Sequence, residues 1–159
     1  MGRHCGILVT MYLFFVAAAS ADEKPNFTGA WKQVGSPDRA YINKIEHQDP
    51  NLKVVTTIAG TPTGTSSLQR PLAALFLERT CSTDGTEQAS EGKPGRERWT
   101  TVYWQGSALV FLMVDKKDCS VTVTRETWTL SDAGKTLTKT RRVIGPDGLT
   151  EQKSVLEKQ

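Results

Sequence analysis

Residues 26–32 read Asn-Phe-Thr-Gly-Ala-Trp-Lys and place a Gly-x-Trp motif near the start of the chain. Alternation along a strand turns successive side chains to opposite faces of a sheet. A large aromatic side chain on the first strand of an almost wholly β chain is well placed to plug one end of a barrel. Trp31 is therefore predicted to be a structural residue of a barrel floor.

The residues before this motif divide into the three parts of a secretory signal peptide. Arg3 gives a basic start, residues 7–19 are almost wholly apolar, and an Ala-Ser-Ala triplet ends at Ala21. The apolar run is shorter than the roughly 20 residues of a spanning helix, which favours cleavage over a membrane anchor. We expect residues 1–21 to be a signal peptide. Residues 22–159 would then be one secreted or periplasmic domain without a membrane span.

Charge and cysteine usage agree with export. The formal net charge of +3 falls to +2 when Arg3 leaves with the leader, which is too small to indicate a nucleic-acid partner. Cys5 lies in the leader, so the mature chain keeps Cys81 and Cys119. An even pair in an oxidising compartment predicts a Cys81–Cys119 disulfide, with two buried free thiols as the alternative.

Turn residues divide the mature chain into short strands. Glycine, asparagine, aspartate and proline recur between stretches rich in Val, Ile, Thr and aromatic residues. The predicted strands are 27–34, 39–47, 51–59, 73–82, 86–91, 96–105, 107–115, 119–130, 135–144 and 149–157. Such a chain is all-β, and we expect an antiparallel up-and-down meander of about eight to ten strands closed into a barrel, since closure removes exposed edges. An open sheet or a two-sheet sandwich is the alternative.

Two patterns leave local questions open. Residues 71–79 have apolar residues at helical spacing after Pro71, so this segment is either a strand or a short helix. In 135–144, Arg141 is in phase with Leu137 and Val143. If those apolar side chains point inward, so does Arg141, which then needs an aromatic ring, Glu126 or a ligand's carboxylate as partner.

The Gly-x-Trp strand, the all-β meander and an arginine on a late strand resemble the lipocalin and fatty-acid-binding-protein superfamily of ligand-carrying barrels. The resemblance implies that Trp31 packs against Arg141 to close the barrel floor. The chain also resembles a group of uncharacterised exported bacterial proteins, through its start, its 45–54 segment (IEHQDPNLKV), its 128–138 hairpin (WTLSDAGKTLT) and its closing Gly-Pro-Asp-Gly turn. That second resemblance implies no activity.

The mature chain lacks the side-chain sets of an enzyme or a metal site. Its one histidine, His47, lies beside a turn, and no Gly-x-Ser-x-Gly elbow is present. One histidine and two cysteines predicted to be paired leave no metal-ligand spacing. His47 is expected to be a surface residue, and no catalytic residue, metal or cofactor is predicted.

The first functional hypothesis is an exported, non-catalytic barrel that binds a small apolar or amphipathic ligand. A lipophilic ligand would meet four aromatic walls and one polar anchor: Tyr41, Tyr103, Phe111 and Trp128, with Arg125. Core packing is the alternative role of each aromatic. The second hypothesis is an envelope interaction module with a filled barrel and an unidentified protein partner. A pocket of a few hundred Å³ would favour the first.

Overall fold

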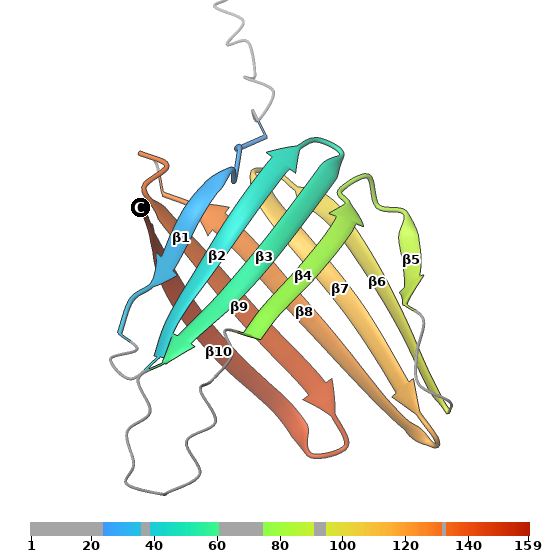
Figure 1. The fold of residues 1–159 in the computed structure, drawn as a ribbon. Helices are drawn as coiled ribbons and strands as arrows, with labels where there is room; N and C mark the ends of the chain where they lie inside the picture. The colour runs from blue at the N-terminus through green and yellow to red at the C-terminus, as the bar shows by residue number, and fades with distance from the viewer. Residues whose placement is uncertain (1–23, 36–38, 61–74, 91–94, 132) are drawn as a thin grey trace, which may run out of the picture.

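The computed structural model describes residues 24–35, 39–60, 75–90, 95–131 and 133–159, and ten antiparallel strands occupy most of them (Figure 1). The strands are β1 (Gly29–Gln33), β2 (Arg39–Gln48), β3 (Asn51–Gly60), β4 (Leu75–Ser82), β5 (Glu87–Ser90), β6 (Arg96–Gln105), β7 (Ala108–Lys117), β8 (Ser120–Leu130), β9 (Thr136–Gly145) and β10 (Gly148–Lys158). The predicted leader, residues 1–21, lies outside the described residues. Within the described ranges, no helix has the length and apolar character to cross a membrane.

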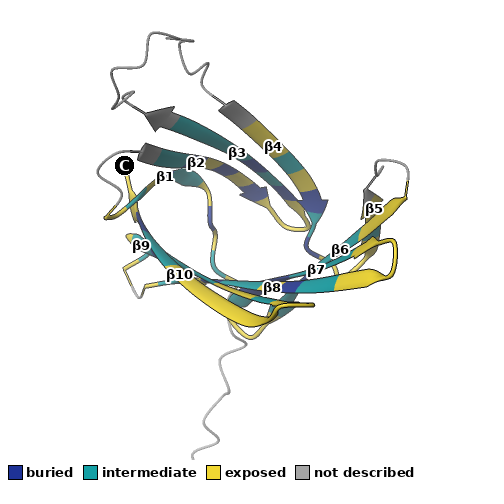
Figure 2. Cartoon of the chain, turned by 90° about the horizontal axis from the view of Figure 1, so that it is seen from below, coloured by how far each residue is buried: buried dark blue, intermediate teal, exposed yellow. Residues whose placement is uncertain are grey.

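The strands form one meander that curves into a nearly closed barrel (Figure 1, Figure 2). The order in the sheet is β4-β3-β2-β1-β10-β9-β8-β7-β6-β5, so the first and last strands of the chain pair with each other. The sheet ends at β4 and β5, which are consecutive in the chain. The predicted antiparallel barrel is confirmed, and the alternatives of an open sheet and a two-sheet sandwich are wrong.

Turn chemistry explains why the predicted strands lie within two residues of the observed ones. Gln105 and Ala108 are register partners, so Gly106 and Ser107 form a two-residue hairpin turn, and Gly106 has φ 58°. Glycine adopts this left-handed conformation without a steric penalty. Residues 71–79 were expected to form either a strand or a short helix. From residue 75 onward they belong to strand β4, so the helix is wrong there. Residues 71–74 lie outside the described part.

The hydrophobic core fills one end of the barrel. Its residues come from the later halves of β2, β4, β6, β8 and β10 and the first halves of β3, β7 and β9, and these meet at the same end (Figure 1). The buried cluster is Phe27, Trp31, Ile45, Leu52, Val54, Cys81, Val102, Leu109, Phe111, Trp128, Leu137 and Leu156. Phe27 precedes β1 and packs its ring 5.9 Å from that of Trp128, so the chain entering β1 closes this end.

Trp31 lies in this core, but without Arg141. The Trp31 side chain is fully buried, and its Nε1 donates a hydrogen bond of 2.8 Å to the carbonyl oxygen of Phe27. The cation near its ring is Lys158, whose Nζ lies 5.5 Å from the ring centroid, because Lys158 is the register partner of Trp31 on β10. The expected Trp31–Arg141 pair is therefore wrong, since Arg141 lies toward the opposite end of β9 from the core residue Leu137.

The predicted Cys81–Cys119 disulfide is also wrong, because both cysteines are free thiols. Cys81 lies near the end of β4, buried in the core, and its burial raises the pKa of the thiol. Cys119 is exposed in the turn between β7 and β8, at the other end of the barrel (Figure 1). Cysteines at opposite ends of a barrel cannot reach the geometry of a disulfide.

Candidate ligand-binding site

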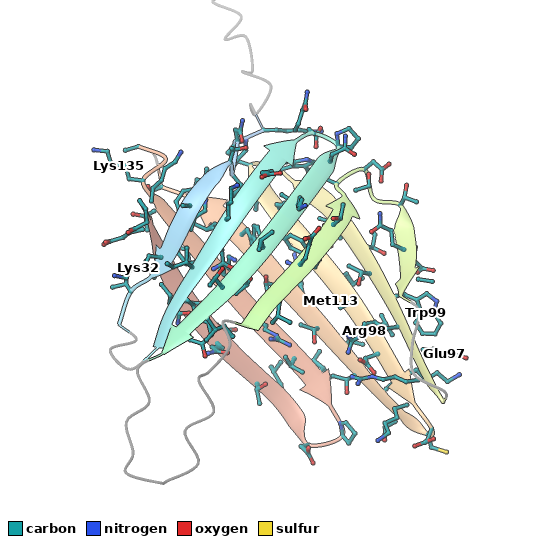
Figure 3. The ribbon with its side chains drawn as sticks, viewed as in Figure 1. Lys32, Glu97, Arg98, Trp99, Met113 and Lys135 are labelled. Carbon is teal, nitrogen blue, oxygen red and sulfur yellow. The ribbon has the colours of Figure 1, made fainter. Side chains whose placement is uncertain are left out.

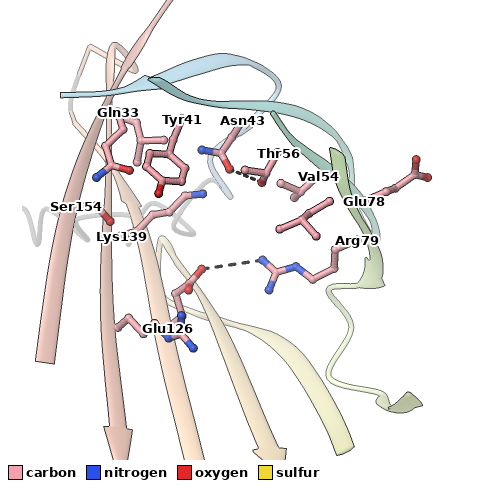
Figure 4. A pocket seen from close by; sticks show the side chains of 13 residues that line it. Gln33, Tyr41, Asn43, Val54, Thr56, Glu78, Arg79, Glu126, Lys139 and Ser154 are labelled. Carbon is pink, nitrogen blue, oxygen red and sulfur yellow. Dashed lines mark hydrogen bonds and ion pairs between the residues drawn. The ribbon is translucent and has the colours of Figure 1, made fainter. Parts of the chain in front are cut away.

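Beyond the core, the interior of the barrel is polar. A cavity of about 380 Å³ opens there, within the usual range of small-molecule sites, about 300–1,000 Å³. Most of its lining comes from inward-facing positions two residues apart on facing strands (Figure 4). The lining consists of Gln33, Tyr41, Asn43, Val54, Thr56, Leu77, Glu78, Arg79, Glu126, Lys139, Arg141, Ser154 and Leu156.

Two cations and one carboxylate meet above the aromatic rings of the core. The Arg79 guanidinium lies 4.4 Å from the ring centroid of Phe111, and its Nη2 is 4.0 Å from Glu126 Oε1. The same Glu126 oxygen accepts a hydrogen bond of 2.6 Å from Trp128 Nε1. Lys139 Nζ lies 3.9 Å from the centroid of the Trp128 ring. Glu126 is thus engaged by both Trp128 and Arg79, while Lys139 rests on an aromatic face.

The environment of Lys139 disfavours its charged form. Burial lowers the pKa of Lys139 to about 8, the Glu126 carboxylate opposes this effect, and the Arg79 guanidinium adds to it. Desolvation has this direction for any lysine, because the ammonium group loses hydration that the surroundings do not replace. The amine of Lys139, which lines the first cavity, is therefore partly unprotonated near neutral pH.

A second cavity, of about 400 Å³, adjoins the first and shares Arg141 with it. Arg98 and Met113 border it on β6 and β7 (Figure 3). Arg96 and Arg98 each place an Nη2 at 2.6 Å from Asp115 Oδ2, and these hydrogen bonds lower the pKa of Asp115 to about 2. Two guanidinium groups thus share one carboxylate, which leaves a net positive charge beside Arg141.

Positive charge exceeds negative charge across the two cavities. Their linings contain six cationic and three carboxylate side chains: Arg79, Lys139, Arg141, Arg96, Arg98 and Lys117 against Glu78, Glu126 and Asp115. Glu78 forms an ion pair of 3.0 Å with Lys53, so its charge is balanced by a residue outside both linings. A concave surface with an excess of one sign focuses its potential, and this one attracts anions.

The five residues predicted to bind ligand divide between the two faces of the sheet. Tyr41 lines the first cavity. Phe111 and Trp128 also face inward but are fully buried, so a ligand would meet Arg79 and Lys139 before it met their rings.

Tyr103 and Arg125 face outward, and the prediction that they bind ligand in the barrel is wrong. Tyr103 alternates with the buried, inward Val102, and Arg125 with the inward Glu126, which lines the cavity. Arg125 donates a hydrogen bond of 2.6 Å to Gln105 Oε1 on the outer surface. The pairing of β7 with β8 is continuous through Arg125, so no bulge turns this side chain inward.

His47 is part of the core end and not a surface turn residue. Its Nδ1 accepts a hydrogen bond of 3.4 Å from the Phe27 amide, and its ring lies 5.7 Å from that of Trp104. Burial lowers the pKa of His47, against the opposing charge of Asp49. His47 therefore holds Phe27 in place as a neutral hydrogen-bond acceptor. In the described residues no group of three His, Cys, Asp or Glu side chains could hold a metal ion.

Sequence reasoning missed Arg79 and Lys139 as site residues. Lys139 is in phase with Leu137 and Arg141, so the same alternation that predicts an inward Arg141 also predicts an inward Lys139. Arg79 carried no such signal, because its segment was ambiguous between strand and helix.

The comparisons with known proteins agree with this fold. No family model matches the chain, and no curated protein sequence matches it. The structure of zebrafish ileal bile acid-binding protein complexed with cholic acid is similar, with 14% identity, a TM-score of 0.56, and coverage of 84% of this chain and 98% of that one. Secretory abundant heat soluble protein 4 from Ramazzottius varieornatus is similar at 15% identity, a TM-score of 0.53, and coverage of 84% and 94%. The chain therefore has the fold of a fatty-acid-binding-protein-like barrel.

Proposed function

We propose that the protein is an exported, non-catalytic barrel that binds a small amphipathic molecule with an anionic group. The observation that supports this most is the excess of cations around the two cavities above an apolar core. Arg79 and Arg141 are the proposed anchors of the anionic group, because guanidinium groups bind carboxylates through two parallel hydrogen bonds. Val54, Leu77 and Leu156 supply apolar lining. The zebrafish protein of similar fold is complexed with cholic acid, which supports an amphipathic ligand for this barrel.

The alternative of an interaction module required a filled barrel. Cavities of about 380 and 400 Å³ do not fit that requirement, so ligand binding is favoured.

Export is proposed from the sequence of residues 1–21. Protein purified from its own source should begin at Asp22, and an intact leader on the purified protein would contradict export by cleavage.

Adjacent arginines on β9 give a matched test of the binding site. Arg141 lines both cavities, while Arg142 faces outward and forms an ion pair of 2.5 Å with Glu151. We expect Arg141→Met to weaken binding of the fluorescent anion 8-anilinonaphthalene-1-sulfonate about tenfold, as expected for loss of a charge-assisted hydrogen bond. Arg142→Met should leave the affinity unchanged. Equal effects of the two variants, together with the absence of co-purifying small molecules in native mass spectrometry, would overturn the proposal.

A further inference from the structure

Lys139 occupies a position inside the barrel that suits covalent capture of a ligand. Its Nζ lies 3.9 Å from the Trp128 ring centroid, and its side chain borders the cavity of about 380 Å³. Among the ion pairs formed by the described residues, none includes Lys139. We propose that Lys139 forms a reversible imine with an amphipathic aldehyde bound in this cavity.

The amine is available for this reaction near neutral pH. With a pKa of about 8, roughly a quarter of Lys139 is unprotonated at pH 7.5, against about one part in a thousand for an ordinary lysine. Desolvation in an apolar surrounding and a neighbouring cation are the two means by which proteins activate a lysine nucleophile. Trp128 and Arg79 supply these two conditions here.

The charges that face Lys139 suit the product as well as the reactant. The lone pair of the neutral amine attacks the carbonyl carbon, and one N–H proton passes to the oxygen. A second proton, taken from solvent, lets this hydroxyl leave as water and gives the protonated C=N bond without any oxidant or reductant. The protonated imine places its positive charge near the Trp128 ring, with Glu126 on β8 as the nearby carboxylate. Arg79 on β4 and Arg141 on β9 add positive charge and could hold an anionic group on the same ligand.

Three exposed lysines of the barrel differ from Lys139 because each is paired with a carboxylate. Lys44, Lys53 and Lys116 form ion pairs with carboxylates at 3.4, 3.0 and 3.6 Å, and their side chains are 70%, 42% and 52% exposed. The hydrogen bond from Lys53 to Glu78 raises the pKa of Lys53. Solvated amines that are paired with carboxylates react slowly with carbonyl groups, so selective modification should identify Lys139.

The test uses octanal with sodium cyanoborohydride at pH 7.5, followed by intact mass measurement and peptide mapping. Each imine that forms is reduced and adds the mass of octanal less one oxygen atom. We expect Lys139 to be modified at least about tenfold faster than any other lysine, as its unprotonated fraction predicts. Lys139→Arg, which keeps the cation, and Lys139→Met should both lose this fast modification. Lys153→Arg, on the exposed outer face of β10, should retain it.

Octanoate separates this proposal from that of anion binding, because it has the same chain but cannot form an imine. Displacement of 8-anilinonaphthalene-1-sulfonate by octanoate in Lys139→Arg measures non-covalent binding alone. Octanoate binding together with slow or unselective modification of Lys139 would overturn the imine and leave the proposed function intact. Selective modification of Lys139 without octanoate binding would support the imine and contradict the proposed function.

Discussion

Replacing Trp31 with alanine should remove a large part of the stability of the barrel floor. The side chain is fully buried, and its indole donates a hydrogen bond of 2.8 Å to Phe27. Truncation of a buried tryptophan costs about 3–5 kcal/mol, and loss of the hydrogen bond adds about 1 kcal/mol. We therefore expect the free energy of unfolding to fall by about 5 kcal/mol. With a urea m-value of about 2 kcal/mol/M, the midpoint of unfolding moves down by about 2.5 M.

Urea unfolding followed by far-UV circular dichroism measures this change, and Arg141→Met is its comparison. Arg141 is exposed and does not lie over Trp31, so its replacement should change the free energy of unfolding by less than about 1 kcal/mol. If Trp31→Ala does not fold, Trp31→Phe keeps most of the packing and loses the hydrogen bond, for about 1 kcal/mol. A loss of several kcal/mol in Arg141→Met would refute the reasoning, because it would show that Trp31 depends on Arg141.

Three further predictions concern the backbone, the thiols and the histidine. Gly29→Ala should lower the free energy of unfolding by about 1–2 kcal/mol in the same urea titration, because Gly29 has φ 147°, a backbone conformation that residues with a side chain rarely adopt. Unchanged stability would contradict this backbone conformation. In protein that begins at Asp22, a thiol reagent should titrate Cys119 alone when the chain is folded and both cysteines in urea. The absence of any reactive thiol in urea would instead indicate a disulfide. Stability should be full above pH 6.5 and fall as the pH drops below it, because burial lowers the pKa of folded His47 and only the unfolded chain takes up the proton there. A single titrating group changes the free energy of unfolding by at most about 1.4 kcal/mol per pH unit. Calorimetry at several pH values should show a weaker pH dependence of stability for His47→Gln than for the unchanged chain. An equal pH dependence would rule out His47 as the cause.

The strands could be predicted because turns carry their own local chemistry. Gly106 needs a left-handed backbone in a two-residue hairpin, and its place in the sequence marks the turn without knowledge of the rest of the fold. Alternation within a strand then fixes which side chains share a face. It does not say which face is inside when both carry apolar groups, as in 96–105, and that is why Tyr103 was assigned to the wrong face.

The site was less predictable because it depends on contacts between distant strands. Arg79 on β4 and Glu126 on β8 are close only because the sheet curves round on itself. The expected disulfide failed for the same reason: an even cysteine count says nothing about which end of a barrel each residue occupies. Lys139 could have been found by carrying the phase of Leu137 along β9, since both lie on the inner face.

Stability and the proposed binding of a ligand depend on different ends of the barrel interior. The core end is apolar and explains why the chain folds. The other end carries an excess of cations, and burial there opposes the charged form of Lys139. Proteins retain such unfavourable groups where function requires them. A bound anion would relieve the repulsion among these cations, so the affinity of the barrel should depend on the charge of its ligand more than on the apolar area that the ligand buries.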